Sequence, residues 1–210
     1  SDLEDRLLAR YPRRRLSAEQ IRDLALATSG LLVERFGGPP VKPYQPAGLW
    51  KEVAMLQSNT REFVRGEGDD LWRRSLYTYW KRAVPPPALL TFDAPTRESC
   101  VVSRATTNTP LQALVLWNDD QFVEAARVLA ARVLEEADGD DSRIVRLLRA
   151  CTARRPDADE LALLDAALHA WRARFADDPD AADALLAVGE APFQGVGVAA
   201  QTLTETELAE

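Results

Sequence analysis

The stretch that decides the fold is residues 109–137, which read TPLQALVLWNDDQFVEAARVLAARVLEEA. Thr109 is a typical N-cap, and Gln112 completes a capping box with it. The run Asn118-Asp119-Asp120 ends this first helix and begins the next. Apolar side chains then recur at helical spacing along one stripe, formed by Phe122, Ala126, Leu129 and Val133. Two consecutive helices are therefore predicted, at 110–117 and 120–137.

The helical pattern continues toward the C-terminus, where two apolar sets can face each other across a turn: Ile144, Leu147, Leu148 and Cys151 on one side, and Leu161, Leu164, Leu168, Trp171 and Phe175 on the other. This pattern predicts antiparallel helices at 143–153 and 158–175, which form a helical hairpin over residues 143–176. Trp171 is expected in its core. Asp178-Pro179 is typical of the start of one more short helix.

A further helix is predicted near the N-terminus. Ser17 is its N-cap, and Gln20 completes a capping box. Apolar residues at helical spacing continue to Leu32, and Gly37-Gly38 provides the expected end. Residues 38–70 are rich in Pro, Gly and polar residues and are expected to form a long ordered loop, a feature that is commonly functional in compact domains.

Side chains at residues 74–81 alternate between two sides. A period of two with aromatic residues is typical of a strand, and residues 99–103 offer an antiparallel partner, with a short helical turn at 88–92 between them. The alternative is that the first run continues as helix from Asp70. The sequence therefore predicts a mainly α single domain over residues 1–210, with a small antiparallel β-ribbon and long ordered loops.

Composition and charge exclude several classes of protein. At 210 residues, of which 46% are hydrophobic, the chain can bury one sizeable core, and no apolar run approaches the roughly 20 residues that span a membrane. Lys and Arg exceed Asp and Glu by four in residues 1–104, whereas Asp and Glu exceed Lys and Arg by eleven in residues 105–210. The acidic half and the lack of a recognition motif argue against nucleic-acid binding.

The cysteines and the single histidine do not form a recognised haem-binding, zinc-binding or catalytic pattern. Cys100 and Cys151 have neither haem-attachment nor zinc-type spacing, which excludes haem and structural zinc in this segment. They are predicted to be buried thiols or, in an oxidising compartment, a disulfide. His169 lies in the middle of a predicted helix, so a Ser-His-Asp triad is not expected. The acidic runs lack the pattern of an EF-hand, and no metal site is predicted.

Four charged residues in and before the first predicted helix share one face: Arg15, Glu19, Arg22 and Asp23. Paired carboxylates there could act as acid and base or hold a metal. Interleaved arginines favour ion pairs instead, which lower the carboxylate pKa and weaken proton donation near neutral pH. A structural polar network is thus the preferred interpretation. Because buried charges need partners, this face is predicted to meet Arg104 or Asp93 beside the β-ribbon.

A second group of polar and aromatic residues clusters around the predicted strand ends and helix starts. Backbone N–H groups are free at such positions, so these side chains could bind an anionic or hydroxyl-rich ligand while aromatic rings stack on a sugar. The alternative is that they are helix caps and core residues. The candidate ligand-binding residues of this group are Tyr77, Lys81, Asp93, Arg97, Arg104, Asn108, Gln112, Asn118 and Asp119.

Three motifs carry a resemblance to a known family: RRSLYTYWKR at 73–82, FDAP at 92–95 and RATTNTPLQAL at 104–114. With the charged face at 15–23, they resemble the C-terminal domain of planctomycete-type cytochrome c-domain proteins. This is a domain of unknown function, number fifteen fifty-three, also called the first planctomycete-specific domain. Such domains usually begin upstream, with a helical segment rich in Trp, Arg and Asn. The chain is therefore expected to be the C-terminal part of a larger family domain.

The resemblance implies an extracytoplasmic module, periplasmic or at the cell surface. Its relatives follow a cytochrome c-like domain and another planctomycete-specific domain, and the family is associated with growth on complex, commonly sulfated polysaccharides. Haem is then expected only in a sibling domain of the parent chain. The expected partners are such sibling domains and, as a second kind of partner, a glycan.

Three functions are compatible with the sequence. The first is a substrate- or partner-binding module of a cytochrome c-linked protein. The second is a carbohydrate-active enzyme domain that uses Asp93, Asp119 or Glu19, and the third is a purely structural docking domain. Whether the domain is an enzyme stays open at this point. Two carboxyl groups facing across a cleft at roughly 5 to 10 Å would favour glycoside chemistry, and an apolar patch near the N-terminus would favour docking.

Overall fold

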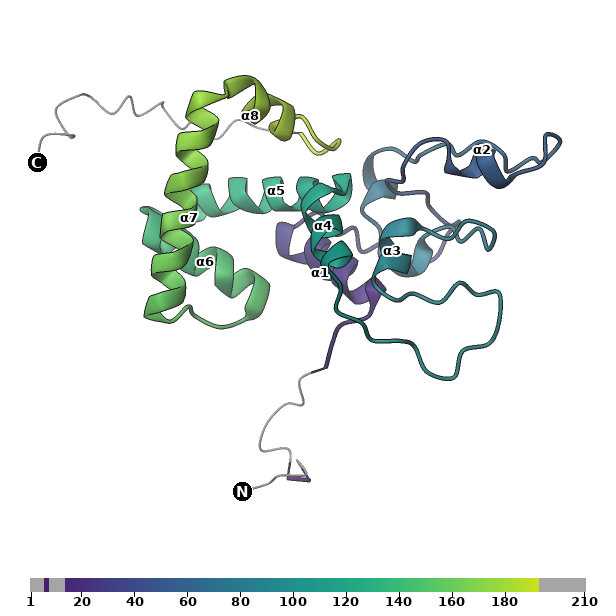
Figure 1. The fold of residues 1–210 in the computed structure, drawn as a ribbon, viewed down its shortest axis with the longest axis horizontal. Coiled ribbons are helices and arrows are strands. Elements are labelled where there is room, and N and C mark those ends of the chain that lie inside the picture. Colours follow the sequence, from purple (N-terminus) through teal and green to yellow (C-terminus); the bar gives the residue numbers. More distant parts are fainter. Residues whose placement is uncertain (1–5, 8–13, 193–210) are drawn as a thin grey trace, which may run out of the picture.

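The computed structural model describes residues 6–7 and 14–192 and is mainly helical (Figure 1). The α-helices in these ranges are α1 (Ala18–Ser29), α2 (Leu49–Val53), α3 (Pro87–Thr91), α4 (Pro110–Asn118), α5 (Asp120–Glu136), α6 (Asp140–Thr152), α7 (Ala158–Asp177) and α8 (Pro179–Leu186). Two short 3-10 helices, η1 (Gly68–Leu71) and η2 (Ser75–Tyr77), lie between α2 and α3. None of the described helices combines the length and the apolar character needed to cross a membrane.

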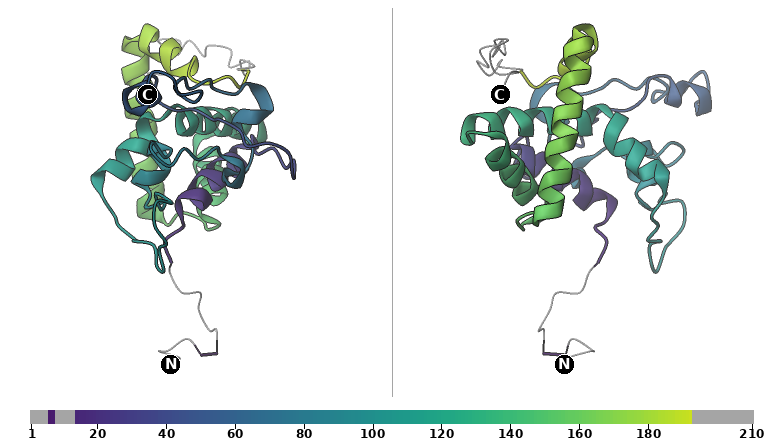
Figure 2. Two further views of the ribbon diagram at one scale, coloured as in Figure 1. Left: turned by 90° about the vertical axis from the view of Figure 1, so that its right-hand side faces the viewer. Right: turned by 60° about the vertical axis from the view of Figure 1, so that its left-hand side comes forward.

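The core forms where α1, α3, α4 and α5 meet. α1 packs along α5, and α3 contacts both α1 and α4 (Figures 1 and 2). Phe92 and Phe122 meet edge to face in this core, with ring centroids 6.0 Å apart, which is a favourable arrangement of aromatic rings. The segment between α1 and α3 contains α2, η1 and η2; η2 contacts α1, whereas the part with α2 extends away from these helices (Figure 1). The buried side chains of this cluster are Ala18, Leu89, Phe92, Ala94 and Phe122.

The four helices predicted between residues 110 and 175 are present as α4 to α7. The predicted capping box at Thr109 is formed. Three of the four residues in the predicted stripe of α5 are buried. The exception is Ala126, which is exposed, while Ala125 is buried instead. Spacing and caps thus predicted the helices well and the buried face to within one position.

α6 and α7 pack against each other, but α7 is less buried than predicted. Arg172 near the end of α7 pairs with Asp140 at the start of α6, and Arg154 after α6 pairs with Glu160 at the start of α7, so the two helices run antiparallel. The prediction that Trp171 lies in the core is wrong: it is 47% exposed. α7 lies at the edge of the molecule (Figure 2), so an apolar stripe is only partly covered there.

The predicted β-ribbon is not present in the described part of the chain. Residues 74–81 are extended apart from η2, and Thr78 pairs in parallel with Val41 through an isolated bridge. The hydrogen bonds of this bridge are 2.8 and 2.7 Å long. Residues 99–103 form an exposed loop, and α3 occupies the predicted helical turn. The strand predicted at 74–81 is therefore wrong, because η2 occupies three of its residues and only isolated bridges form at Thr78 and Lys81.

α1 ends earlier than predicted, at Ser29 rather than at Gly37-Gly38. Gly30 takes a left-handed conformation with φ of 87° and donates to the carbonyls of Leu26 and Ala27, which closes the helix. A Cβ at Gly30 would lie 2.9 Å from Arg132 Nη1. Because glycine adopts this conformation without steric cost, it stops the helix although apolar spacing continues beyond it.

The cysteines fit neither predicted alternative. Cys100 and Cys151 are both free, and both are exposed. Cys100 lies in the loop between α3 and α4, and Cys151 lies in the last turn of α6. The prediction of buried thiols and that of a disulfide are therefore both wrong.

Candidate functional site

Arg22 is the central residue of the charged face predicted on α1. Its side chain is 2% exposed. The guanidinium donates to the carbonyl oxygens of Leu71 (2.6 Å) and Arg73 (2.8 Å) and to Gln121 Oε1 on α5 (2.7 Å). Burial lowers the pKa of Arg22 to about 10, so the side chain stays charged at neutral pH. Arg22 therefore holds the 71–75 segment and α5 on α1.

Asp23 and Arg73 extend this buried network. Asp23 Oδ1 accepts from the N–H of Ser75 at 2.8 Å. Arg73 is 1% exposed and donates to three carbonyl oxygens within residues 35–39. Its guanidinium lies 3.8 Å from the centroid of the Tyr77 ring, and the Tyr77 hydroxyl accepts from the same segment. Asp23 and Tyr77, two of the predicted site residues, thus bind backbone N–H groups on either side of the long loop, and Arg73 binds carbonyl groups at its start.

Gln112 and Asp93 anchor the loop between α3 and α4. Gln112 is 2% exposed, donates to Thr91 O (3.0 Å) and Thr107 Oγ1 (3.1 Å), and accepts from Arg15 Nη2 (2.5 Å). Asp93 has a φ of 64° and accepts from the N–H (2.7 Å) and the hydroxyl (2.9 Å) of Thr107. Aspartate is one of the few residues that tolerate this left-handed conformation. Gln112 and Asp93 thus hold the two ends of the loop between α3 and α4 together.

Glu19 and Arg104 join the charged face of α1 to this loop, as predicted. Arg104 Nη1 and Glu19 Oε2 are 2.7 Å apart, and both side chains are partly exposed. Partial burial acts to raise the pKa of Glu19, but the hydrogen bond and the charge of Arg104 outweigh it and hold the pKa below its usual value. Glu19 is therefore ionised at neutral pH and is poorly suited to donate a proton.

Arg97 and Arg104 border a hollow in the loop between α3 and α4. The hollow has a volume of about 420 Å³ and is also lined by Glu98 and Cys100. Arg97 lies over the ring of Trp80, with the guanidinium carbon 4.1 Å from the ring centroid. Here the structure brings two predicted ligand-binding residues together at the open surface.

The remaining polar candidates are Lys81, Asn118 and Asn108, and the first two make hydrogen bonds elsewhere. Lys81 Nζ donates to Thr60 O at 2.6 Å, in the long loop. Asn118 Nδ2 donates to Leu114 O at 2.8 Å, within α4. Asn108 is exposed just before α4. None of these three residues is among those that line the hollow.

Asp119 is held at the start of α5. It is the N-cap of this helix and accepts from the N–H of Gln121 at 3.1 Å. Burial raises the pKa of Asp119 above its ordinary value. Asp93, Asp119 and Glu19 thus serve three different contacts. The described structure does not place them as the pair of carboxylates across a cleft that glycoside chemistry uses.

Glu124 was not predicted as a key residue, although it is fully buried on α5. Its carboxylate accepts from Tyr44 Oη (3.1 Å), Trp72 Nε1 (2.9 Å), and the backbone N–H groups of Glu190 and Ala191 (both 2.7 Å). A buried carboxylate is stable where several donors satisfy it. The only signal in the sequence was a charged residue beside an apolar stripe, a position that is usually exposed.

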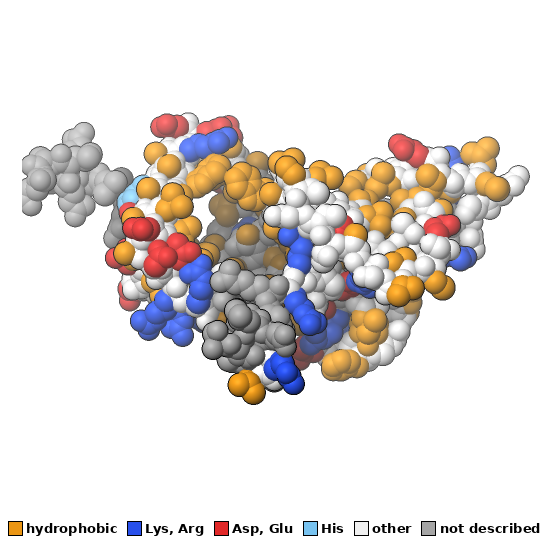
Figure 3. Space-filling view, turned by 60° about the horizontal axis from the view of Figure 1, so that its bottom comes forward, with side chains coloured by type: hydrophobic (Ala, Val, Ile, Leu, Met, Phe, Trp, Pro, Cys, Tyr) orange, Lys and Arg blue, Asp and Glu red, His pale blue; other side chains and the backbone are white. Residues whose placement is uncertain are grey.

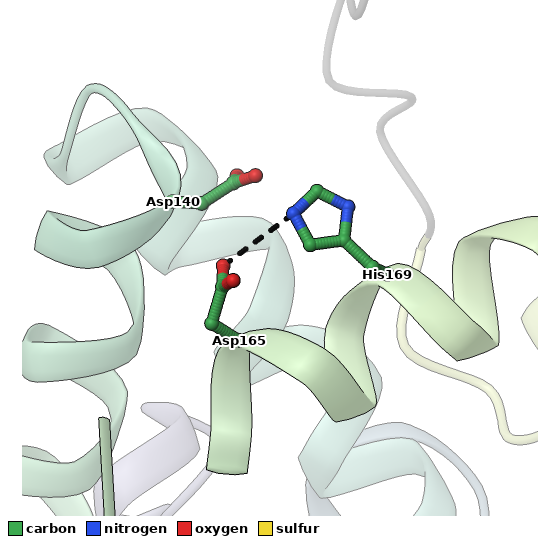
Figure 4. Close-up of side chains that lie close together, drawn as sticks. All are labelled: Asp140, Asp165 and His169. Carbon is green, nitrogen blue, oxygen red and sulfur yellow. Dashed lines mark ion pairs between the residues drawn. The ribbon is translucent and has the colours of Figure 1, made fainter. Parts of the chain in front are cut away.

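One cluster of potential metal ligands lies between α6 and α7 (Figure 4). His169 Nε2 is 3.5 Å from Asp165 Oδ1, and one ligand atom from each of these residues and Asp140 lie within 4.8 Å of one another. Arg172 forms two hydrogen bonds with Asp140, of 2.5 and 2.8 Å, which lower the pKa of Asp140. A metal ion would have to compete with this guanidinium, so the cluster is best explained as a helix–helix contact.

The outward face of α4 carries apolar side chains. Leu111, Leu114 and Trp117 recur every three residues and are 57%, 54% and 76% exposed. The buried residue of α4 is Gln112. Apart from Val115, which packs on the core, the large apolar side chains of α4 therefore lie outside instead of on the buried side. On the lower face of the molecule, basic side chains gather near the middle with apolar side chains on both sides (Figure 3).

The fold and these contacts define a mainly helical domain whose long loops are tied to helices by buried arginines. A family model described as PSD1, protein of unknown function (DUF1553), matches residues 1–168. The chain belongs to this family, which is the family predicted from the motifs at 73–82, 92–95 and 104–114. No curated protein and no solved structure shows a significant match to the chain.

Proposed function

We propose that this domain is a binding module that docks a partner protein through the outward face of α4. The observation that carries this proposal is the exposed row of Leu111, Leu114 and Trp117. Apolar side chains that point outward do not stabilise their own domain by burial. Contiguous exposed apolar surface is typical of interaction sites. Tryptophan is also among the residues that contribute most to binding energy at protein interfaces.

The proposed partner is a sibling domain in an extracytoplasmic, cytochrome c-linked parent chain that is associated with complex polysaccharide use. We infer this partner from the family resemblance. The contact of Arg15 with Gln112 in the first turn of α4 supports it, because it joins the chain ahead of α1 to this helix.

The variant Trp117→Ala is expected to weaken binding to the preceding domains of the parent chain by about tenfold or more. A central aromatic anchor contributes about 2 kcal/mol or more, and each 1.4 kcal/mol corresponds to tenfold in affinity. Isothermal titration calorimetry of this chain against those domains measures the effect.

Trp171→Ala is the matched control, since Trp171 is also partly exposed but lies on α7. It should leave the affinity unchanged. Thermal unfolding of both variants establishes that they fold. Equal affinities of wild type and Trp117→Ala would rule out α4 as the docking face.

A second candidate function is the binding of an acidic or sulfated glycan in the hollow at Arg97 and Arg104. The 420 Å³ volume and the guanidinium groups support it, because arginine pairs with sulfates and carboxylates in a bidentate manner. An enzymatic role through Asp93, Asp119 or Glu19 has less support, since each carboxylate is engaged in a separate structural contact.

The glycan hypothesis predicts that Arg97→Ala lowers the affinity for a sulfated oligosaccharide at least fivefold, and that affinity falls as salt rises. Calorimetric titration of the full parent chain with sulfated and unsulfated forms of one oligosaccharide tests this. Arg149→Ala, at an exposed position on α6, is the control. Equal binding of both oligosaccharide forms would contradict the hypothesis.

A further inference from the structure

All three lysines of this arginine-rich chain converge on one tryptophan. Lys42 Nζ and Lys81 Nζ lie 5.4 and 4.5 Å from the centroid of the Trp50 ring. Lys51 follows Trp50 in α2 and lines the same cavity. No other lysine occurs in the sequence. The long loop and the segment after η2 thus bring together ammonium groups, which are compact point charges without the fixed planar fork of a guanidinium.

The cavity beside Trp50 has a volume of about 300 Å³. Trp50 is 2% exposed, and Phe63, which also lines the cavity, meets it edge to face with ring centroids 5.1 Å apart. Two lining residues have buried N–H groups without a hydrogen-bond partner among the described residues, namely Gln45 Nε2 and Trp50 Nε1. Buried donors in native proteins nearly always have an acceptor. We therefore expect a ligand that supplies acceptor oxygens to these two N–H groups.

The charges around the cavity favour an anion. Lys51 and Arg65 line it, and Glu62 is the carboxylate among its lining residues. Glu62 is paired with Lys51 at 2.9 Å, and Arg65 is paired with Glu190. The other two lysines, against the Trp50 ring, leave the surroundings with an excess of positive charge. A carboxylate satisfies both requirements, because it accepts several hydrogen bonds and carries the opposite charge.

We propose that this cavity binds a carboxylate carried on a ring-sized body, either a sugar acid or an aromatic acid. Its volume is more than a bare ion needs and lies at the lower end of the range for small-molecule pockets. The carboxylate would accept from Gln45 Nε2 and Trp50 Nε1, and Phe63 would contact the ring. α4 contributes none of the lining residues, so this site is independent of the docking face.

Calorimetric titration with D-glucuronate, benzoate and D-glucose tests the proposal. At least one of the two carboxylates is expected to bind. The one that binds more tightly shows whether the site prefers a sugar ring or an aromatic ring. Glucose, which has the sugar ring without the carboxylate, should bind at least tenfold more weakly than the tighter-binding carboxylate or not at all. Gln45→Leu should weaken carboxylate binding about tenfold, whereas Gln57→Leu, at an exposed position in the same loop, should not change it.

Lysine acetylation gives a second readout on the unaltered chain. Because Lys51 lines the cavity, a bound carboxylate should slow its acetylation several-fold, as measured by mass spectrometry, while the N-terminal amine reacts at the same rate. The proposal is overturned if neither carboxylate binds, if glucose binds as tightly as the tighter-binding carboxylate, or if bound carboxylate leaves the Lys51 rate unchanged. If Gln45→Leu fails to fold, the acetylation rates of the unaltered chain still test whether a carboxylate binds in this cavity.

Discussion

Arg22→Met should lower the free energy of unfolding by about 4 kcal/mol. The substitution removes the buried guanidinium that serves Leu71 O, Arg73 O and Gln121 Oε1. Each buried acceptor left without a donor costs about 1–3 kcal/mol. Because a domain of this kind has only about 5–15 kcal/mol of stability in total, the variant would be close to unfolding at 37 °C. Urea denaturation followed by circular dichroism measures the change.

Arg149→Met is the matched control, since Arg149 is exposed on α6. Its effect should stay within about 0.5 kcal/mol. If Arg22→Met were as mild as this control, the buried network would not be what holds the 71–75 segment on α1.

Glu124→Ala is expected to cost about 3–5 kcal/mol, because four donors lose a common acceptor. Burial raises the pKa of Tyr44 well above its ordinary value, so this hydroxyl remains a donor throughout the accessible pH range. Gly189→Ala should act on the same contact, since a Cβ at Gly189 would lie 2.5 Å from Glu124 Oε1 and the residue has a φ of +90°. Thermal unfolding of each variant provides the comparison.

The double variant separates the two causes of the Gly189→Ala effect. In the Glu124→Ala background the clash is gone, and Gly189→Ala should cost only the backbone strain, about 1–2 kcal/mol. The two single effects should therefore sum to more than the effect of the double variant. Strict additivity would show that Gly189 and Glu124 act separately, and the proposed contact would be wrong.

The sequence pointed to the dense polar motifs, but it did not show whether they form a ligand site or a buried structural network. Arg22, Gln112 and Asp119 look the same in a ligand site and in a buried structural network, because both environments demand hydrogen-bonding partners. The partners decide between them, and they are distant in the chain: Gln121, which accepts from Arg22, is 99 residues away. The hollow at Arg97 and Arg104 is the exception, since these two candidates stay at the surface.

The sequence by itself determined the helices α4 to α7, because capping boxes and apolar spacing act over one or two turns and need no distant contact. It also determined family membership through its motifs. Only the tertiary structure decided that residues 74–81 pair with the segment at Val41, that α4 turns its leucines and Trp117 outward, and that the lysines gather at Trp50. These features depend on which surfaces remain after packing, and that is set by contacts between segments far apart in the chain, which local periodicity does not encode.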